Sequence, residues 1–179
     1  PVYAMPKMKD FLENNGPWSQ LVSLQNIVIQ PLTANAPVVL TEHLSIHPFL
    51  VPHRDEYSET VGYEINGPEQ TAIFIPDINK WSIWERDIVA EVKRVDIALL
   101  DGSFYENGEI PGRDMSEIPH PFVTESMELF NQLNTENRSK IHFIHINHTN
   151  PLLRQRSTAR KEVRRAGFAV AEEGQRIEL

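Results

Sequence analysis

Short apolar runs with a period of two alternate along this chain with longer amphipathic stretches. Runs rich in Ile, Val and Phe predict strands, while Pro, Gly, Asn and Asp between them predict turns. The predicted strands are Val2–Ala4, Ile27–Gln30, Val38–Thr41, Leu44–Val51, Val61–Ile65, Thr71–Ile75, Asp96–Leu100, Ile141–Ile146 and a closing hairpin of Phe168–Ala171 with Arg176–Leu179. The predicted helices are Pro6–Asn14, Trp84–Arg94, Phe122–Leu133 and Leu153–Ala166, with Gly16–Leu24 as a loop.

The order strand, helix, strand between Thr71 and Leu100 indicates a βαβ-like unit and α/β architecture. We therefore expect Thr71–Ile75, Asp96–Leu100 and Ile141–Ile146 to be parallel neighbours in one sheet. Their carboxyl ends would then meet at one edge, which is where open α/β sheets bind ligands.

Three histidines follow one another at intervals of three in the strand 141–146 and the loop after it. Side chains alternate between the two faces of a strand, so His142 and His148 are predicted on one side and His145 on the other. His148 lies at the tip, where a loop can present it to a cleft, whereas His142 and His145 are expected to be packed and hydrogen-bonded.

Four polar candidates fall just beyond predicted strand ends: His53, Asp77, Asp101 and His148, with His120 at a helix start nearby. Each has a simpler explanation, since Asp77 could cap a helix and His53 could be an ordinary loop histidine. Taken together, they fit a metal site made only of nitrogen and oxygen ligands, the type that binds Zn, Mn or Fe.

Composition narrows the class of protein. The chain has 179 residues, a net charge of −8 and no cysteine. Disulfides and thiolate-bound metals are therefore excluded, and the acidic charge argues against a broad nucleic-acid-binding face, although one dense basic run lies at 154–165. No apolar run approaches the length of a membrane span and no signal-like segment is found, so a cytoplasmic location is the default expectation.

These residues resemble the C-terminal half of the metallo-β-lactamase-fold hydrolases, whose fold is an αββα sandwich. His53, shortly before a Gly-Tyr strand, is similar to a metal-binding histidine of that family, and Asp77 in Ile-Pro-Asp to its bridging aspartate. Asp101 falls where ribonuclease Z and phosphodiesterase relatives carry a His-Glu-Ala-Thr-Phe segment. His120 resembles the histidine near the leaving group, and His148 the last metal histidine.

A more specific resemblance is to members related to pyrroloquinoline quinone biosynthesis protein B, and it spans nearly the whole chain. It is carried by Leu99–Gly102, Gly112–Met115 and, most specifically, Ile144–Pro151. In that protein the positions matching Asp77 and His148 are not the usual metal ligands, whereas this chain has the hydrolase residues at both.

The family's His-x-His-x-Asp-His motif is absent, and the chain starts at Pro1 with an immediate strand rather than an initiator Met. We therefore expect residues 1–179 to be the C-terminal portion of a single metallo-β-lactamase-fold domain, an α/β sandwich without its N-terminal strands. Such an edge would leave apolar surface uncovered, which favours association and allows a homo-oligomer.

The resemblance implies a metal-dependent hydrolase of a small-molecule phosphodiester, lactone or other ester, with two divalent ions in the full-length protein. His53, Asp77 and His148 would be the metal ligands, with His120 and Asp101 in catalytic roles. Two alternatives stay open: an iron-dependent oxygenase, and a binding domain without catalysis. Because this chain offers only three candidate ligands, we expect it to bind metal weakly and to show little or no hydrolase activity by itself.

Overall fold

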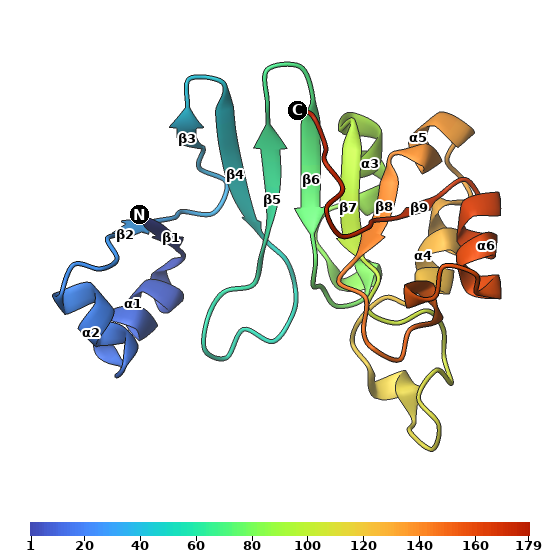
Figure 1. Cartoon of the computed structure of the whole chain (residues 1–179), viewed down its shortest axis with the longest axis horizontal. Coiled ribbons are helices and arrows are strands. Elements are labelled where there is room, and N and C mark those ends of the chain that lie inside the picture. Colours follow the sequence, from blue (N-terminus) through green and yellow to red (C-terminus); the bar gives the residue numbers. More distant parts are fainter.

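The main sheet has seven strands. The predicted polar residues that follow strand ends lie at one edge of this sheet. The computed structural model describes residues 1–179, with strand order β3-β4-β5-β6-β7-β8-β9 and a separate β1-β2 pair (Figure 1). The strands are β1 Val2–Ala4, β2 Ile29–Pro31, β3 Val38–Thr41, β4 Leu44–Leu50, β5 Val61–Asn66, β6 Thr71–Ile75, β7 Ile97–Asp101, β8 Ile141–Ile144 and β9 Ala169–Val170. The helices are α1 Pro6–Asn14, α2 Trp18–Ser23, α3 Ile88–Arg94, α4 Val123–Phe130, α5 Thr135–Ser139 and α6 Thr158–Arg165, with three-residue turns η1 Trp81–Ile83, η2 Met115–Glu117 and η3 Pro151–Leu153.

The strand directions bring the carboxyl ends of β4, β6, β7 and β8 to one edge. Strands β3 to β6 pair antiparallel, and β6 to β9 pair parallel, so β4 runs in the same direction as β6, β7 and β8. The prediction that Thr71–Ile75, Asp96–Leu100 and Ile141–Ile146 are parallel neighbours is confirmed, although β8 ends two residues earlier, at Ile144.

The core lies on one face of the sheet. Ile73, Ala98, Leu100 and Phe143 share that face by register and are fully buried. They belong to one apolar cluster with side chains from α3, α4 and α6. The α/β architecture thus follows from strands that place alternate apolar residues under three amphipathic helices.

Gly62 allows strands β4 and β5 to pack tightly against this core. A Cβ at Gly62 would lie 2.5 Å from Cε2 of Phe49 and 3.1 Å from the carbonyl oxygen of Phe74. Phe49 is 1% exposed and cannot swing away into solvent. We expect Gly62→Ala to lower the free energy of unfolding by about 1–3 kcal/mol in urea denaturation. Glu69→Ala, at an exposed turn position, is the control and should be neutral; equal stability of the two variants would contradict the packing account.

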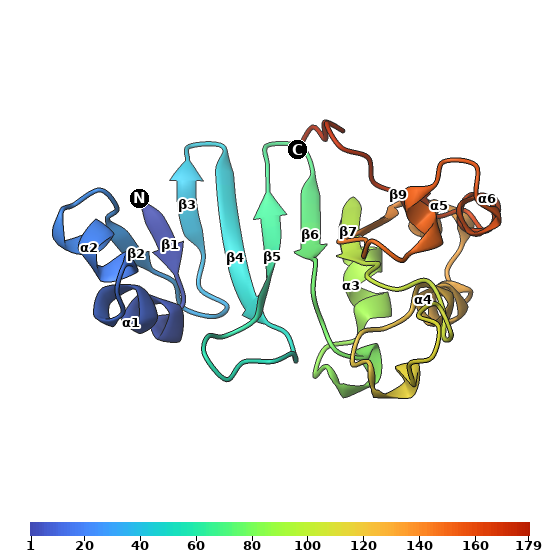
Figure 2. The same ribbon diagram turned by 60° about the horizontal axis from the view of Figure 1, so that its bottom comes forward.

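The N-terminal segment forms a small unit of its own at one end of the sheet, β1–α1–α2–β2 (Figures 1 and 2). The predicted loop at 16–24 is wrong, because Trp18–Ser23 form helix α2. The Trp18 ring lies 5.0 Å from that of Phe11, which packs α2 on α1. Two more helices begin later than predicted, at Ile88 and Thr158, where Asp87 and Ser157 cap them.

The predicted closing hairpin is also wrong. β9 pairs in parallel with β8, and the residues after it form no strand. The last residues instead run back across the sheet, so that the C-terminus lies beside the β5–β6 turn (Figures 1 and 2). Leu179 packs so closely on Gly67 that a Cβ there would lie 2.4 Å from it. The Glu173-Gly174 turn therefore redirects the chain without pairing two strands.

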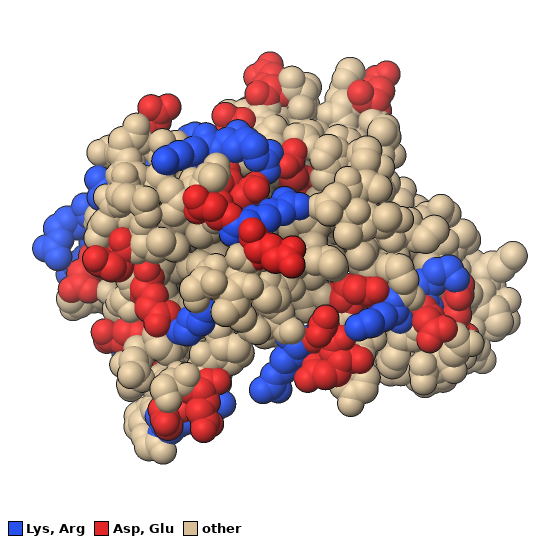
Figure 3. Space-filling model, turned by 180° about the vertical axis from the view of Figure 1, so that it is seen from behind, with Lys and Arg blue, Asp and Glu red and all other residues tan.

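Charged side chains on the face opposite Figure 1 are interleaved rather than sorted into one basic field (Figure 3). On helix α3, Arg94 lies between two carboxylates, because its guanidinium contacts Glu64 at 2.7 Å and Glu91 at 2.5 Å. No helix combines the length and apolar character that crossing a membrane would require.

Candidate metal centre and adjoining pocket

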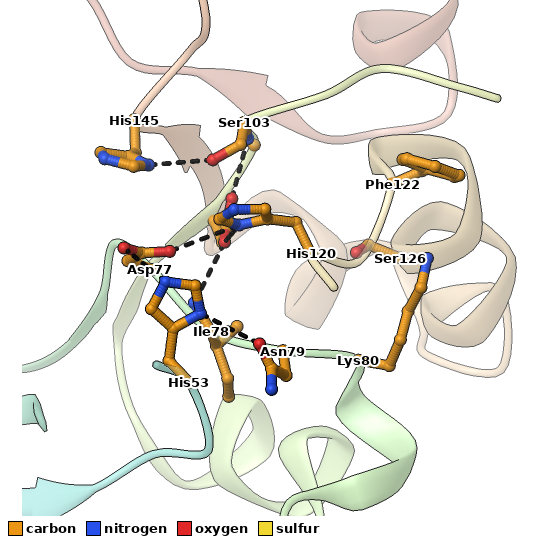
Figure 4. Close-up of polar contacts among 12 residues, drawn as sticks. His53, Asp77, Ile78, Asn79, Lys80, Ser103, His120, Phe122, Ser126 and His145 are labelled. Atoms are coloured by element: carbon orange, nitrogen blue, oxygen red, sulfur yellow. Dashed lines mark hydrogen bonds and ion pairs between the residues drawn. The ribbon is translucent and has the colours of Figure 1, made fainter. Parts of the chain in front are cut away.

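Four of the five predicted polar residues meet at the carboxyl edge of the sheet (Figure 4). His53 follows β4, Asp77 follows β6, Asp101 ends β7, and His120 precedes α4. Donor atoms of His53, Asp77 and His120 all lie within 4.8 Å of one another. Residues far apart in the sequence thus converge because their strands end at the same edge.

His53 is oriented by Asn79. Its Nδ1 lies 3.0 Å from Asn79 Oδ1, and because a carbonyl oxygen only accepts, Nδ1 carries the proton and donates. The other ring nitrogen, Nε2, therefore bears the lone pair, and it faces Asp77 Oδ2 at 3.2 Å. A lone pair aimed at a carboxylate is favourable only with a proton or a cation between them. A metal-binding histidine usually has this arrangement, with one ring nitrogen donating a hydrogen bond and the other facing the cation.

Asp101 is fully buried and every contact that it makes is an accepted hydrogen bond. Oδ1 accepts from the Ser103 backbone at 2.8 Å, and Oδ2 accepts from the Ile78 backbone at 3.1 Å. Oδ2 also lies 2.9 Å from His120 Nδ1, which must donate to it. Asp101 therefore fixes both the tautomer and the orientation of His120 and leaves Nε2 of that ring free.

The charge around His120 favours its protonated form. Burial lowers the pKa of His120, but the hydrogen bond and charge of Asp101, together with the charge of Asp77, outweigh burial and raise it. His142 shows the opposite case, since burial lowers its pKa and its Nδ1 has no hydrogen-bond partner.

These opposite shifts predict a measurable split between two histidines in the metal-free chain. NMR titration of the imidazole signals should show His120 titrating above, and His142 below, the ordinary histidine range near 6.5. A raised folded-state pKa means that protonated His120 stabilises the fold below the unfolded pKa, and this contribution is lost as pH rises through the raised value. Asp101→Asn should lower the pKa of His120 and leave that of His142 unchanged. Identical titration of both histidines would contradict the electrostatic account.

The residues fit a divalent ion. Asp77 Oδ1 is buried without a hydrogen-bond partner, although it lies 3.3 Å from His120 Nδ1, because the single proton there points to Asp101. A buried carboxylate oxygen that no donor satisfies is costly unless a cation completes it. Imidazole nitrogens and a carboxylate suit Zn, Mn or Fe.

His148 does not belong to this cluster. It is exposed, and its Nδ1 contacts Asn147 Oδ1 at 3.0 Å. It nevertheless lines a pocket of about 480 Å³ together with His120 and His145. His120 thus occupies the place in the three-residue cluster that the sequence analysis gave to His148, and a ligand role for His148 stays a prediction.

His145 was predicted to be packed and hydrogen-bonded; the hydrogen bond is confirmed, but the packing is wrong. His145 is exposed on the same pocket, because β8 has already ended and its backbone adopts φ 57°. Its Nδ1 lies 2.9 Å from the hydroxyl of Ser103, a residue that is 3% exposed. Strand alternation could not place a residue in the left-handed region beyond the strand; only the nearby Asn147 and Asn150 signalled a turn.

The sequence and the fold both match known proteins. Residues 1–146 match the family described as the beta-lactamase superfamily domain. The chain belongs to this superfamily. It has the metallo-β-lactamase fold, as shown by its likeness to zinc-bound PqqB from Methylobacterium extorquens, with a TM-score of 0.79 and 25% identity over 99% of this chain and 61% of that one.

Other known proteins are similar over shorter or more distant matches. Coenzyme PQQ synthesis protein B of Gluconobacter oxydans is 30% identical over 68% of this chain and 40% of its own length. A diphosphatase of the PhnP family shares the fold, with a TM-score of 0.59 and 18% identity over 100% of this chain and 58% of that one. The chain spans less than two thirds of the length of each of these relatives.

Proposed function

We propose that the protein is a metal-dependent hydrolase of a small-molecule ester, either a phosphodiester, a lactone or another ester. The proposal depends above all on the cluster of His53, Asp77 and His120 beside the hydrogen-bonded pair Asp101–His120. In the first arrangement His53 and Asp77 suit a divalent ion, and the Asp101–His120 pair suits proton transfer. His120, which belongs to both arrangements, lines the pocket in which a substrate would lie.

Each residue has a distinct role in this proposal. His53, through Nε2, and Asp77 would hold the metal, and His148 would hold a second ion in the full-length protein. A bound divalent ion supplies an activated water and polarises the ester. The raised pKa of His120 favours its protonated form, from which Nε2 would donate a proton to the leaving oxygen. Asp101 holds Nδ1 of His120 and keeps Nε2 directed at the substrate.

Metal analysis of the full-length protein, combined with assays on phosphodiester, lactone and ester substrates, tests the proposal. We expect bound Zn, Mn or Fe and metal-dependent turnover of one class. Absence of metal and of turnover on all three classes would refute it. Bound metal without turnover of any class would point instead to a binding domain without catalysis.

A second candidate is an iron-dependent oxygenase related to pyrroloquinoline quinone biosynthesis. It is favoured by the similarity to coenzyme PQQ synthesis protein B, because histidine and carboxylate ligands bind Fe(II) as well as zinc. Oxygen consumption with a tyrosine-containing substrate, present with iron and absent without it, would favour this candidate over hydrolysis.

A further inference from the structure

A second and larger pocket lies next to the pocket lined by His120, His145 and His148, called the histidine pocket below. Its volume is about 710 Å³, and its walls are the start of the long loop after β7, at Tyr105 and Glu106, and the segment from Pro151 to Glu162. The proposed hydrolase site does not use this pocket. Its lining is mainly polar, which points to a charged or hydrogen-bonding ligand rather than an apolar one.

Arg154 and Arg156 line this pocket, and both are exposed. Neighbouring arginines are already paired: Arg160 donates to Glu172 at 2.7 Å, and Arg164 lies 3.7 Å from the same carboxylate. Arg154 and Arg156 have no such partner, so their guanidinium groups are free to bind a ligand. They stand out because the chain as a whole carries a net charge of −8.

The two acidic side chains of the pocket do not neutralise these arginines by direct contact. Glu162 uses Oε2 to accept a hydrogen bond from the Tyr105 hydroxyl at 2.6 Å. Glu106 is exposed and forms no ion pair with either arginine. Ser157 and Thr158 add hydroxyl groups to the lining.

The two pockets are separated by two adjoining segments. In the first segment, Phe104 lines the histidine pocket and Tyr105 lines the pocket of Arg154 and Arg156. In the second segment, His148 lines the histidine pocket and Pro151 lines the other one. Glu109 joins these segments, because it accepts hydrogen bonds from the Tyr105 backbone at 2.6 Å and from the Thr149 hydroxyl. The two pockets therefore adjoin each other at the segments that Glu109 holds together.

We propose that the pocket lined by Arg154 and Arg156 binds an oxyanion, a phosphate or a carboxylate group. The planar guanidinium presents paired N–H groups that match either group, and hydrogen bonds between charged partners are the stronger kind. Anion binding by the pocket stands by itself. In the hydrolase, the bound oxyanion would be an anionic group of the substrate remote from the ester, and this step rests on the proposed hydrolase function.

The test is an NMR titration of the metal-free chain, from which EDTA has been removed by dialysis, with inorganic phosphate or succinate at constant ionic strength set with sodium chloride. Arg154→Ala/Arg156→Ala is compared with Arg165→Ala/Arg176→Ala, which removes the same charge from exposed positions outside the pocket. We expect saturable shifts at Tyr105 and Ser157 in the wild type. Affinity should fall about tenfold or more in the pocket variant and less than about twofold in the control.

Saturation by phosphate alone, or by succinate alone, identifies which group the pocket takes. No saturable shift with either anion would overturn the proposal, as would equal weakening in the two double variants, which would indicate long-range charge only. Phosphate binding that depends on the arginines in a full-length protein that hydrolyses no ester would keep this site and reject the hydrolase.

Discussion

Asp101→Ala is expected to lower the free energy of unfolding by about 3–5 kcal/mol, the largest effect of any single change at the site. Asp101 is 0% exposed and accepts from two backbone N–H groups and from His120. Removing the carboxylate leaves the backbone N–H groups of Ile78 and Ser103 buried without an acceptor, at about 1–3 kcal/mol each, and takes the partner of part-buried His120 as well. Urea denaturation followed by circular dichroism measures the loss.

Two comparison variants separate this loss from general charge removal. Glu173→Ala removes an exposed carboxylate and should change stability by less than about 0.5 kcal/mol. Asp101→Asn keeps the shape of the side chain but can accept at only one atom, so we expect an intermediate loss. If Asp101→Ala were as stable as Glu173→Ala, the hydrogen bonds around Asp101 would not hold the site together.

His120→Gln is expected to reduce hydrolysis by the full-length protein about 10²–10⁴-fold, the range associated with a general acid or base. The loss should be smaller for substrates whose leaving group needs no proton, such as a nitrophenol ester, because His120 acts on the leaving oxygen in this proposal. Rates for an activated and an unactivated ester measure the difference.

His43→Gln is the matched control, since His43 is an exposed histidine in the turn between β3 and β4. It should keep full activity on both substrates. Equal losses on activated and unactivated esters in His120→Gln would indicate that His120 serves the metal rather than the leaving group.

Local patterns predicted most of the sheet because apolar alternation and turn residues are local signals. β6 was predicted residue for residue, and the parallel trio followed from the order strand, helix, strand. The prediction for the C-terminal segment was wrong because strand pairing there depends on tertiary structure. A turn at Gly174 is compatible with a hairpin. In the structure, however, β9 pairs with the free edge of β8, and no local pattern indicates this pairing.

The sequence predicted which residues belong to the candidate site, but not how they are arranged in space. Strand ends identified His53, Asp77 and Asp101, because topology brings such ends to one edge. The distinction between His120 and His148 depends on the long loop 104–118, which the Glu109 carboxylate ties to Thr149. His120 reaches the cluster through its bond with Asp101, a contact across 19 residues that periodicity cannot show.

Calorimetric titration of the 179-residue chain with Zn²⁺ and Mn²⁺ tests the central claim, a divalent-metal site at His53 and Asp77. His120 Nδ1, which lies 3.3 Å from Asp77, already donates to Asp101, so His53 and Asp77 are left to bind an ion at this point. We expect at most one ion per chain, bound no more tightly than about 1 μM, with the heat abolished by Asp77→Asn and unchanged by His43→Gln. Tight binding of two ions, or binding indifferent to Asp77→Asn, would contradict the account.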